Sequence, residues 1–78
     1  MAVEFVSNTI HEPRRRQLTE AAVRAGIRNR EGDYAIRVLE SGRYEPWLFE
    51  VQGPERTFSR EFLHPFEKDA SFIRNYFE

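Results

Sequence analysis

The alternation of apolar side chains in the middle of the chain is the feature that most constrains the fold. Two stretches place an apolar residue at every second position: Tyr34, Ile36 and Val38, and then Trp47, Phe49 and Val51. This period is typical of β-strands that bury one face. Turn signals at residues 41–42 and 53–54 divide the region into runs over residues 34–40, 44–52 and 55–62. Because short connections join antiparallel neighbours, the pattern predicts a three-stranded antiparallel meander.

Two segments with the apolar spacing of an α-helix lie before and after this predicted meander. In the first segment, which begins at Pro13, apolar side chains recur at i, i+3, i+4 and i+7: Leu18, Ala21, Ala22 and Ala25. We expect these four to form the buried face and Gly26 to end the helix. The second segment begins at Pro65, and its apolar stripe consists of Phe66, Ala70, Ile73 and Phe77. Both prolines suit a first helical turn, where the missing backbone N–H costs nothing.

These elements predict an α+β fold, a small three-stranded antiparallel β-meander flanked by two helices in the order α-β-β-β-α. Residues 2–6, AVEFV, alternate in the same way and predict an extra short N-terminal strand. A chain of 78 residues has room for one hydrophobic core. Residues 1–78 are therefore expected to form a single small globular domain, with both helices on one face of the sheet.

Few residues favour catalysis or a bound cofactor. The chain has no cysteine, and its two histidines, His11 and His64, each come shortly before a proline at a predicted helix start. A histidine there is typical of a cap or turn, and neither forms an i, i+4 pair of metal ligands. The four glycines are scattered singly, unlike a phosphate-cradling loop. We expect no enzyme activity, no cofactor and no metal site; a small hydrolase that uses His11 or His64 is the least favoured hypothesis.

The same sequence gives no sign of a membrane or secretory segment. No apolar run approaches the roughly 18 residues that a transmembrane helix needs. The N-terminal stretch, MAVEFVSN, carries Glu4 and lacks the basic flank of a secretory signal. We therefore expect a cytoplasmic protein without membrane contact.

The chain has one local excess of basic side chains, and it consists of arginines. Arg14, Arg15 and Arg16 are consecutive at the start of the first predicted helix, yet the formal net charge of the chain is -1. The α-β-β-β-α order is similar to that of double-stranded-RNA-binding domains, a resemblance that implies lysines at the start of the second helix. The corresponding stretch, HPFEKDA, places acidic Glu67 and Asp69 beside its one lysine, and these carboxylates repel phosphate. Nucleic-acid binding is therefore the alternative hypothesis, with contacts assigned to Arg14, Arg15, Arg16, Arg24, Arg28 and Arg30.

Aromatic side chains are concentrated near the C-terminus: Phe62, Phe66, Phe72, Tyr76 and Phe77. Phe72 and Tyr76 lie to one side of the predicted buried stripe, which makes them the candidates for contact with a partner. An exposed strand edge is a second docking route. The preferred hypothesis is a non-enzymatic protein-interaction or regulatory module, which binds an unknown protein partner or self-associates as a homodimer.

Overall fold

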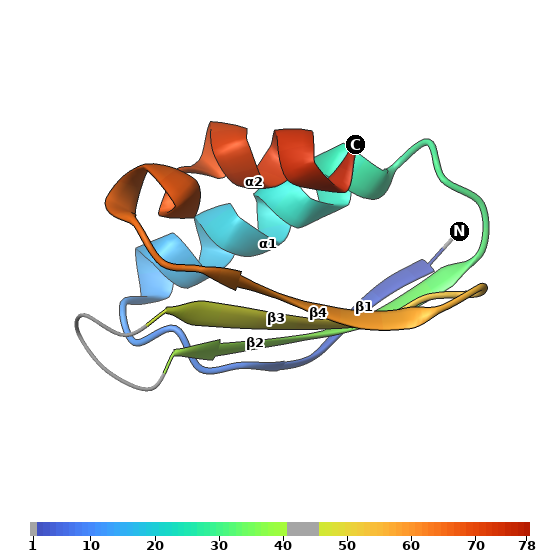
Figure 1. The fold of residues 1–78 in the computed structure, drawn as a ribbon, viewed down its shortest axis with the longest axis horizontal. Coiled ribbons are helices and arrows are strands. Elements are labelled where there is room, and N and C mark those ends of the chain that lie inside the picture. Colours follow the sequence, from blue (N-terminus) through green and yellow to red (C-terminus); the bar gives the residue numbers. More distant parts are fainter. Residues whose placement is uncertain (1, 41–45) are drawn as a thin grey trace.

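The computed structural model describes residues 2–40 and 46–78, which form one sheet with helices packed on one of its faces (Figure 1). The elements in chain order are β1 (Ala2–Asn8), α1 (Pro13–Ile27), β2 (Asp33–Glu40), β3 (Trp47–Gln52), β4 (Thr57–Phe62), the 3-10 helix η1 (Pro65–Lys68) and α2 (Ala70–Phe77). The strands lie in the order β1-β2-β3-β4. The α+β class predicted from the sequence is confirmed.

The sheet is mixed, which is the main difference from the prediction. β2, β3 and β4 form the expected antiparallel meander. β1 adds a fourth strand and runs parallel to β2. A parallel pair needs a long crossover connection, and α1 supplies it. The N-terminal strand is therefore a seven-residue element of a β-α-β unit rather than a short addition.

The hydrophobic core lies between the sheet and the helices. Eight of its members from β2, β3, α1 and α2 are at most 3% exposed: Ile36, Val38, Phe49, Val51, Val23, Ile27, Ile73 and Phe77. The ring of Phe49 meets that of Phe62 edge-on, with centroids 4.9 Å apart. Trp47 is also buried, and its indole N–H donates to the Glu40 carboxylate at 2.6 Å. The alternation thus predicted the inward side chains of β2 and β3 correctly.

The buried face of α1 differs from the predicted one. Its buried residues are Thr19, Ala22, Val23, Gly26 and Ile27. Leu18 is 50% exposed, and Ala21 and Ala25 are exposed as well. Val23 and Ile27 stand four residues apart on one face and offer more apolar area than the alanine stripe. Packing against the sheet therefore turns the helix toward these two larger side chains.

Gly26 lies inside α1 and does not end the helix. It packs against α2, where an added Cβ would lie 2.5 Å from the carbonyl oxygen of Arg74 and 2.8 Å from the Cβ of Phe77. No other residue type fits this approach without moving the helices apart. The prediction that Gly26 ends the helix was therefore wrong, and the glycine instead permits close helix packing.

The C-terminal helical region is interrupted, whereas the sequence spacing predicted one continuous helix from Pro65. After η1, Asp69 caps a new helix, and its carboxylate accepts from the backbone N–H of Ser71 at 3.2 Å. Ile73 and Phe77 are buried as predicted. The interruption takes Phe66 out of the helical stripe, so this residue is exposed and not part of the core.

The strand boundaries also differ slightly from the predicted runs. The run over residues 44–52 begins as a strand at Trp47, and residues 44 and 45 lie outside the described residues, as does the turn predicted at 41–42. β4 begins at Thr57 because the preceding residues form a turn. In that turn the backbone N–H of Gly53 donates to the carbonyl of Arg56 at 3.0 Å.

Candidate interaction surface

β4 forms one edge of the sheet and, within the described residues, pairs with β3 alone (Figure 1). The turn hydrogen bond makes Gly53 and Arg56 a bonded pair at the start of the β3–β4 ladder. Bonded and non-bonded pairs alternate along an antiparallel ladder. Three residues therefore direct their backbone N–H and C=O groups away from β3: Thr57, Ser59 and Glu61. Such groups can pair with an additional strand.

β1, at the other edge of the sheet, is protected against strand addition. Its register shifts between Phe5 and Ser7, which marks a bulge. Arg24 of α1 donates from Nη1 to the carbonyl of Val3 at 2.8 Å, and its guanidinium lies 5.0 Å over the ring of Phe5. Bulges and covering side chains are common means of blocking a sheet edge. The more accessible edge is therefore β4.

An apolar flank lies beside β4 and consists of Leu63, Phe66, Phe72 and Tyr76. Phe72 and Tyr76 project from α2 and are half-buried. Both rings stand edge-on to the buried ring of Phe62, with centroid separations of 5.9 and 5.4 Å. The two residues predicted for partner contact thus lie on the side of α2 that contacts β4, and they also pack against the core.

The most exposed part of the apolar flank comes from the segment between β4 and α2. Phe66 is 65% exposed and Leu63 is 50% exposed. The Phe66 ring stacks on His64 at 5.6 Å and meets Phe72 edge-on at 6.0 Å. Sequence spacing placed Phe66 in the buried stripe because it extended the helix through this residue, and it assigned no role to Leu63. The signal that could have revealed the exposure of Phe66 is Asp69, a preferred helix N-cap in the middle of the supposed helix.

Two arginines place positive charge along β4 on the helical side of the sheet. Arg56 lies 4.7 Å over the ring of Phe58. Arg60 lies 5.0 Å over the ring of Tyr76 and forms an ion pair with Glu67 at 3.6 Å. A guanidinium stacked on a ring keeps its charge and can still donate hydrogen bonds in its own plane. The surface therefore combines open backbone groups, apolar side chains and guanidinium groups.

Glu67 fixes the segment that carries Phe66. Its carboxylate accepts from the backbone N–H groups of His64 at 3.0 Å and Leu63 at 3.1 Å. The hydrogen bond from His64 is the main cause that lowers the pKa of Glu67, and the nearby charge of Arg60 adds to it, while desolvation acts in the opposite direction. His64 is the N-cap residue of η1, which confirms the cap role predicted for this histidine.

Several arginines predicted to contact nucleic acid are engaged within the protein. Arg15 lies 5.1 Å over the ring of Trp47, and Arg16 donates to the carbonyl of Ile10 at 3.3 Å. Arg30 donates to the carbonyls of Phe77, at 3.1 Å, and Glu78, and Arg24 covers the β1 edge. Arg14 and Arg28 are exposed.

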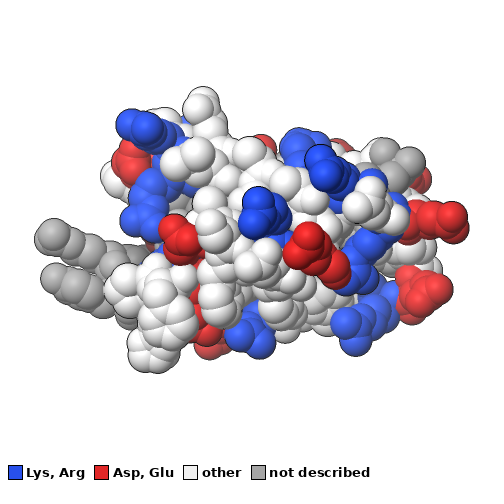
Figure 2. Space-filling model, turned by 90° about the horizontal axis from the view of Figure 1, so that it is seen from above, with Lys and Arg blue, Asp and Glu red and all other residues white. Residues whose placement is uncertain are grey.

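The face of the molecule that carries the helices has no uniform charge in Figure 2, where basic and acidic side chains are interspersed with uncharged surface. A strong phosphate-binding surface requires several cations directed at one track. The basic side chains visible on this face thus do not form one uniform track, and nucleic-acid binding stays a prediction.

A metal-binding or membrane-spanning role has little support among the described residues. His11 is exposed, and its backbone N–H donates to the Glu40 carboxylate at 2.9 Å. Across residues 2–40 and 46–78, no three His, Asp or Glu side chains lie close enough together to hold a metal ion. Neither helix in this part of the chain is long and apolar enough to cross a membrane.

Comparison of this chain with known proteins found no matching protein-family model, no matching curated protein and no matching solved structure.

Proposed function

We propose that the protein is a non-enzymatic interaction module that binds an extended segment of another protein along β4. The observation that carries this proposal is the coincidence of an unprotected strand edge with exposed apolar side chains. A segment added to the sheet would hydrogen-bond to the backbone of Thr57, Ser59 and Glu61. Every second side chain of that segment would then face the apolar flank, including Phe66 and Phe72.

The charges near β4 favour an acidic segment over a second copy of this chain. If two copies paired through β4, Arg56 and Arg60 of both would lie on the same face of the joined sheet, and their like charges would oppose pairing. A segment whose helix-facing positions carry both apolar and acidic side chains would instead place carboxylates beside these arginines and apolar groups on the apolar flank. Arg60 can exchange its intramolecular ion pair with Glu67 for such a partner at small cost, because exposed ion pairs are weak.

Two blocked octapeptides test the proposal: Thr-Val-Thr-Glu-Thr-Val-Thr-Glu, the Val–Glu peptide, and Thr-Val-Thr-Lys-Thr-Val-Thr-Lys, the Val–Lys peptide. In each of them Val and the charged residue lie on the same face of the strand. We expect the Val–Glu peptide to shift the amide NMR signals of Thr57, Ser59 and Glu61 in the 15N-labelled protein. The Val–Lys peptide has the same strand propensity and should bind at least several-fold more weakly, because its charges repel Arg56 and Arg60.

A matched pair of variants at Ser59 separates backbone pairing from side-chain contact. Ser59→Pro removes the outward N–H without removing a hydrogen bond to β3, and proline is tolerated on an edge strand in this position. Ser59→Ala keeps the N–H. We expect the proline variant to lose the peptide and the alanine variant to retain it, with both variants giving folded spectra.

Other outcomes would contradict strand addition of an acidic segment. Equal binding of the two peptides would remove the role of the arginines, and full binding by Ser59→Pro would remove the role of the strand edge. A concentration-dependent mass without peptide, abolished by Ser59→Pro, would identify a second copy of this chain as the occupant instead.

A further inference from the structure

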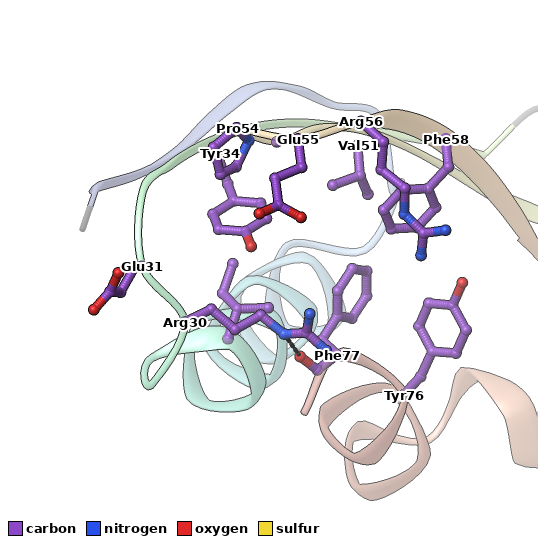
Figure 3. Close-up of a pocket in the computed structure, with 12 residues that line it drawn as sticks. Arg30, Glu31, Tyr34, Val51, Pro54, Glu55, Arg56, Phe58, Tyr76 and Phe77 are labelled. Carbon is purple, nitrogen blue, oxygen red and sulfur yellow. Dashed lines mark hydrogen bonds between the residues drawn. The ribbon is translucent and has the colours of Figure 1, made fainter.

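A pocket of ≈ 450 Å³ lies between the C-terminal end of α1, the β3–β4 turn and α2 (Figure 3). Its apolar lining includes Val51, Phe58 and Phe77, and two of these, Val51 and Phe77, belong to the buried core. Apolar lining with a few polar groups at the rim is the usual character of a small-molecule site. The volume is within the range of pockets that accept such ligands.

Opposite charges lie at the two ends of this pocket, and a further cation, Arg30, lines it and donates to the carbonyls of Phe77 and Glu78. In Figure 3 the guanidinium of Arg56 and the hydroxyl of Tyr76 point toward one another at one end. At the other end the carboxylate of Glu55 and the hydroxyl of Tyr34 lie on the same side of the cavity. Arg56 is stacked on Phe58 and, among the described residues, forms no ion pair with a carboxylate. Its guanidinium is therefore available to an anion at this end.

We propose that this pocket binds a small aromatic monocarboxylate that has a hydrogen-bond donor at its opposite end. The carboxylate would accept from Arg56 and Tyr76, because a guanidinium matches a carboxylate in charge and geometry. The ring would lie against Phe58 and Phe77, and a hydroxyl or N–H group at the far end would donate to Glu55. The position of Glu55 fixes the orientation, since a carboxylate at that end would be repelled. This inference does not rest on strand addition to β4.

Three probes with one ring and different end groups test the assignment: 4-hydroxyphenylacetate, its primary amide and tyramine. They would be titrated into the 15N-labelled full chain, and binding would be followed by amide NMR shifts. We expect the carboxylate to shift signals of the turn at residues 53–56 and of α2 near Tyr76. The neutral amide and the cationic tyramine should bind at least about ten-fold more weakly, because neither presents a carboxylate to Arg56.

Arg56→Gln and Arg37→Gln form a matched pair of variants. Each removes one exposed arginine from the sheet or its turn, but Arg37 lies on β2 and faces away from the helices. We expect Arg56→Gln to weaken 4-hydroxyphenylacetate binding about ten-fold, and Arg37→Gln to leave it unchanged. Both spectra also report whether the variant is folded.

The proposal is overturned if 4-hydroxyphenylacetate causes no shifts at millimolar concentration, or if its shifts map outside the pocket. Equal or tighter binding of tyramine would also overturn it, as would equal effects of the two arginine variants. None of these measurements involves a peptide, so their failure leaves the proposal for β4 to be decided by its own test.

Discussion

Replacement of Gly26 by alanine is the most direct test of how the two helices pack. Helix propensity alone predicts that Gly26→Ala stabilises the protein by about 1 kcal/mol. The structure predicts the opposite, because the new Cβ would lie 2.5 Å from the Arg74 carbonyl oxygen and 2.8 Å from the Cβ of Phe77. Real Cβ atoms essentially never approach other heavy atoms closer than 3.0 Å. Rotation of a side chain cannot relieve this overlap, so α1 and α2 must separate.

The expected magnitude follows from the two opposing effects. Overpacking of a well-packed site costs about 1–3 kcal/mol, and a clash with backbone atoms belongs at the upper end of that range. After the gain in helix propensity, we expect a net loss of about 2 kcal/mol in the free energy of unfolding. In a domain of this size such a loss lowers Tm by about 8–16 °C.

Urea unfolding followed by circular dichroism and by Trp47 fluorescence measures this change. Ala25→Gly is the control, because Ala25 is exposed on the same helix. It should lose about 1 kcal/mol from propensity alone. If Gly26→Ala is as stable as the unmodified protein or more so, the close helix contact described here is refuted.

Three further substitutions and one titration test other parts of the structure. Because the pKa of Glu67 is lowered in the folded state, its carboxylate stabilises the protein at pH values above the ordinary glutamate pKa, and this stabilisation is lost as pH falls through the lowered pKa. The Glu67→Gln variant should therefore be less stable than the unmodified protein at pH 7 and should lose less stability on acidification. Thermal unfolding from pH 7 to 3 measures both effects. Phe49→Ala should lower the free energy of unfolding in urea by about 3–5 kcal/mol, because Phe49 is fully buried; a loss under 1 kcal/mol would place it outside the core. Glu40→Ala leaves the indole N–H of buried Trp47 without its acceptor and should cost about 1–3 kcal/mol, with Glu50→Ala on the open face of the sheet as the neutral control. We expect no binding of duplex or single-stranded DNA or RNA at low salt; salt-dependent binding that is lost when Arg14, Arg15 and Arg16 are replaced by alanine would instead support the nucleic-acid alternative.

The candidate surface was only partly accessible from the sequence. Phe72 and Tyr76 could be selected because they lie off the apolar stripe of a helix, which is a local property. Phe66 could not, because its exposure depends on the new helix start at Asp69. Leu63 belongs to no periodic pattern, so no local signal marked it as exposed. The accessibility of β4 could not be predicted either, since it depends on which strands occupy the two edges of the sheet.

The class of fold and the inward faces of the central strands follow from the residue pattern alone. Side chains alternate strictly across a strand, so the spacing of Ile36, Val38, Phe49 and Val51 leaves one arrangement that buries all four. Turn residues at fixed intervals then made these strands antiparallel neighbours.

Tertiary structure alone decided the pairing of β1, the rotation of α1 and the role of Gly26. Each depends on contacts between residues that are distant in the chain: β1 lies parallel to β2, Val23 and Ile27 face the sheet, and Gly26 meets α2. Several faces of an alanine-rich helix are similarly apolar, so local sequence does not select the one that is buried. A glycine is equally compatible with a helix end and with a close contact between helices. The larger burial of Val23 and Ile27, together with the close approach of the two helices, selected among these alternatives because packing energy depends on the whole core.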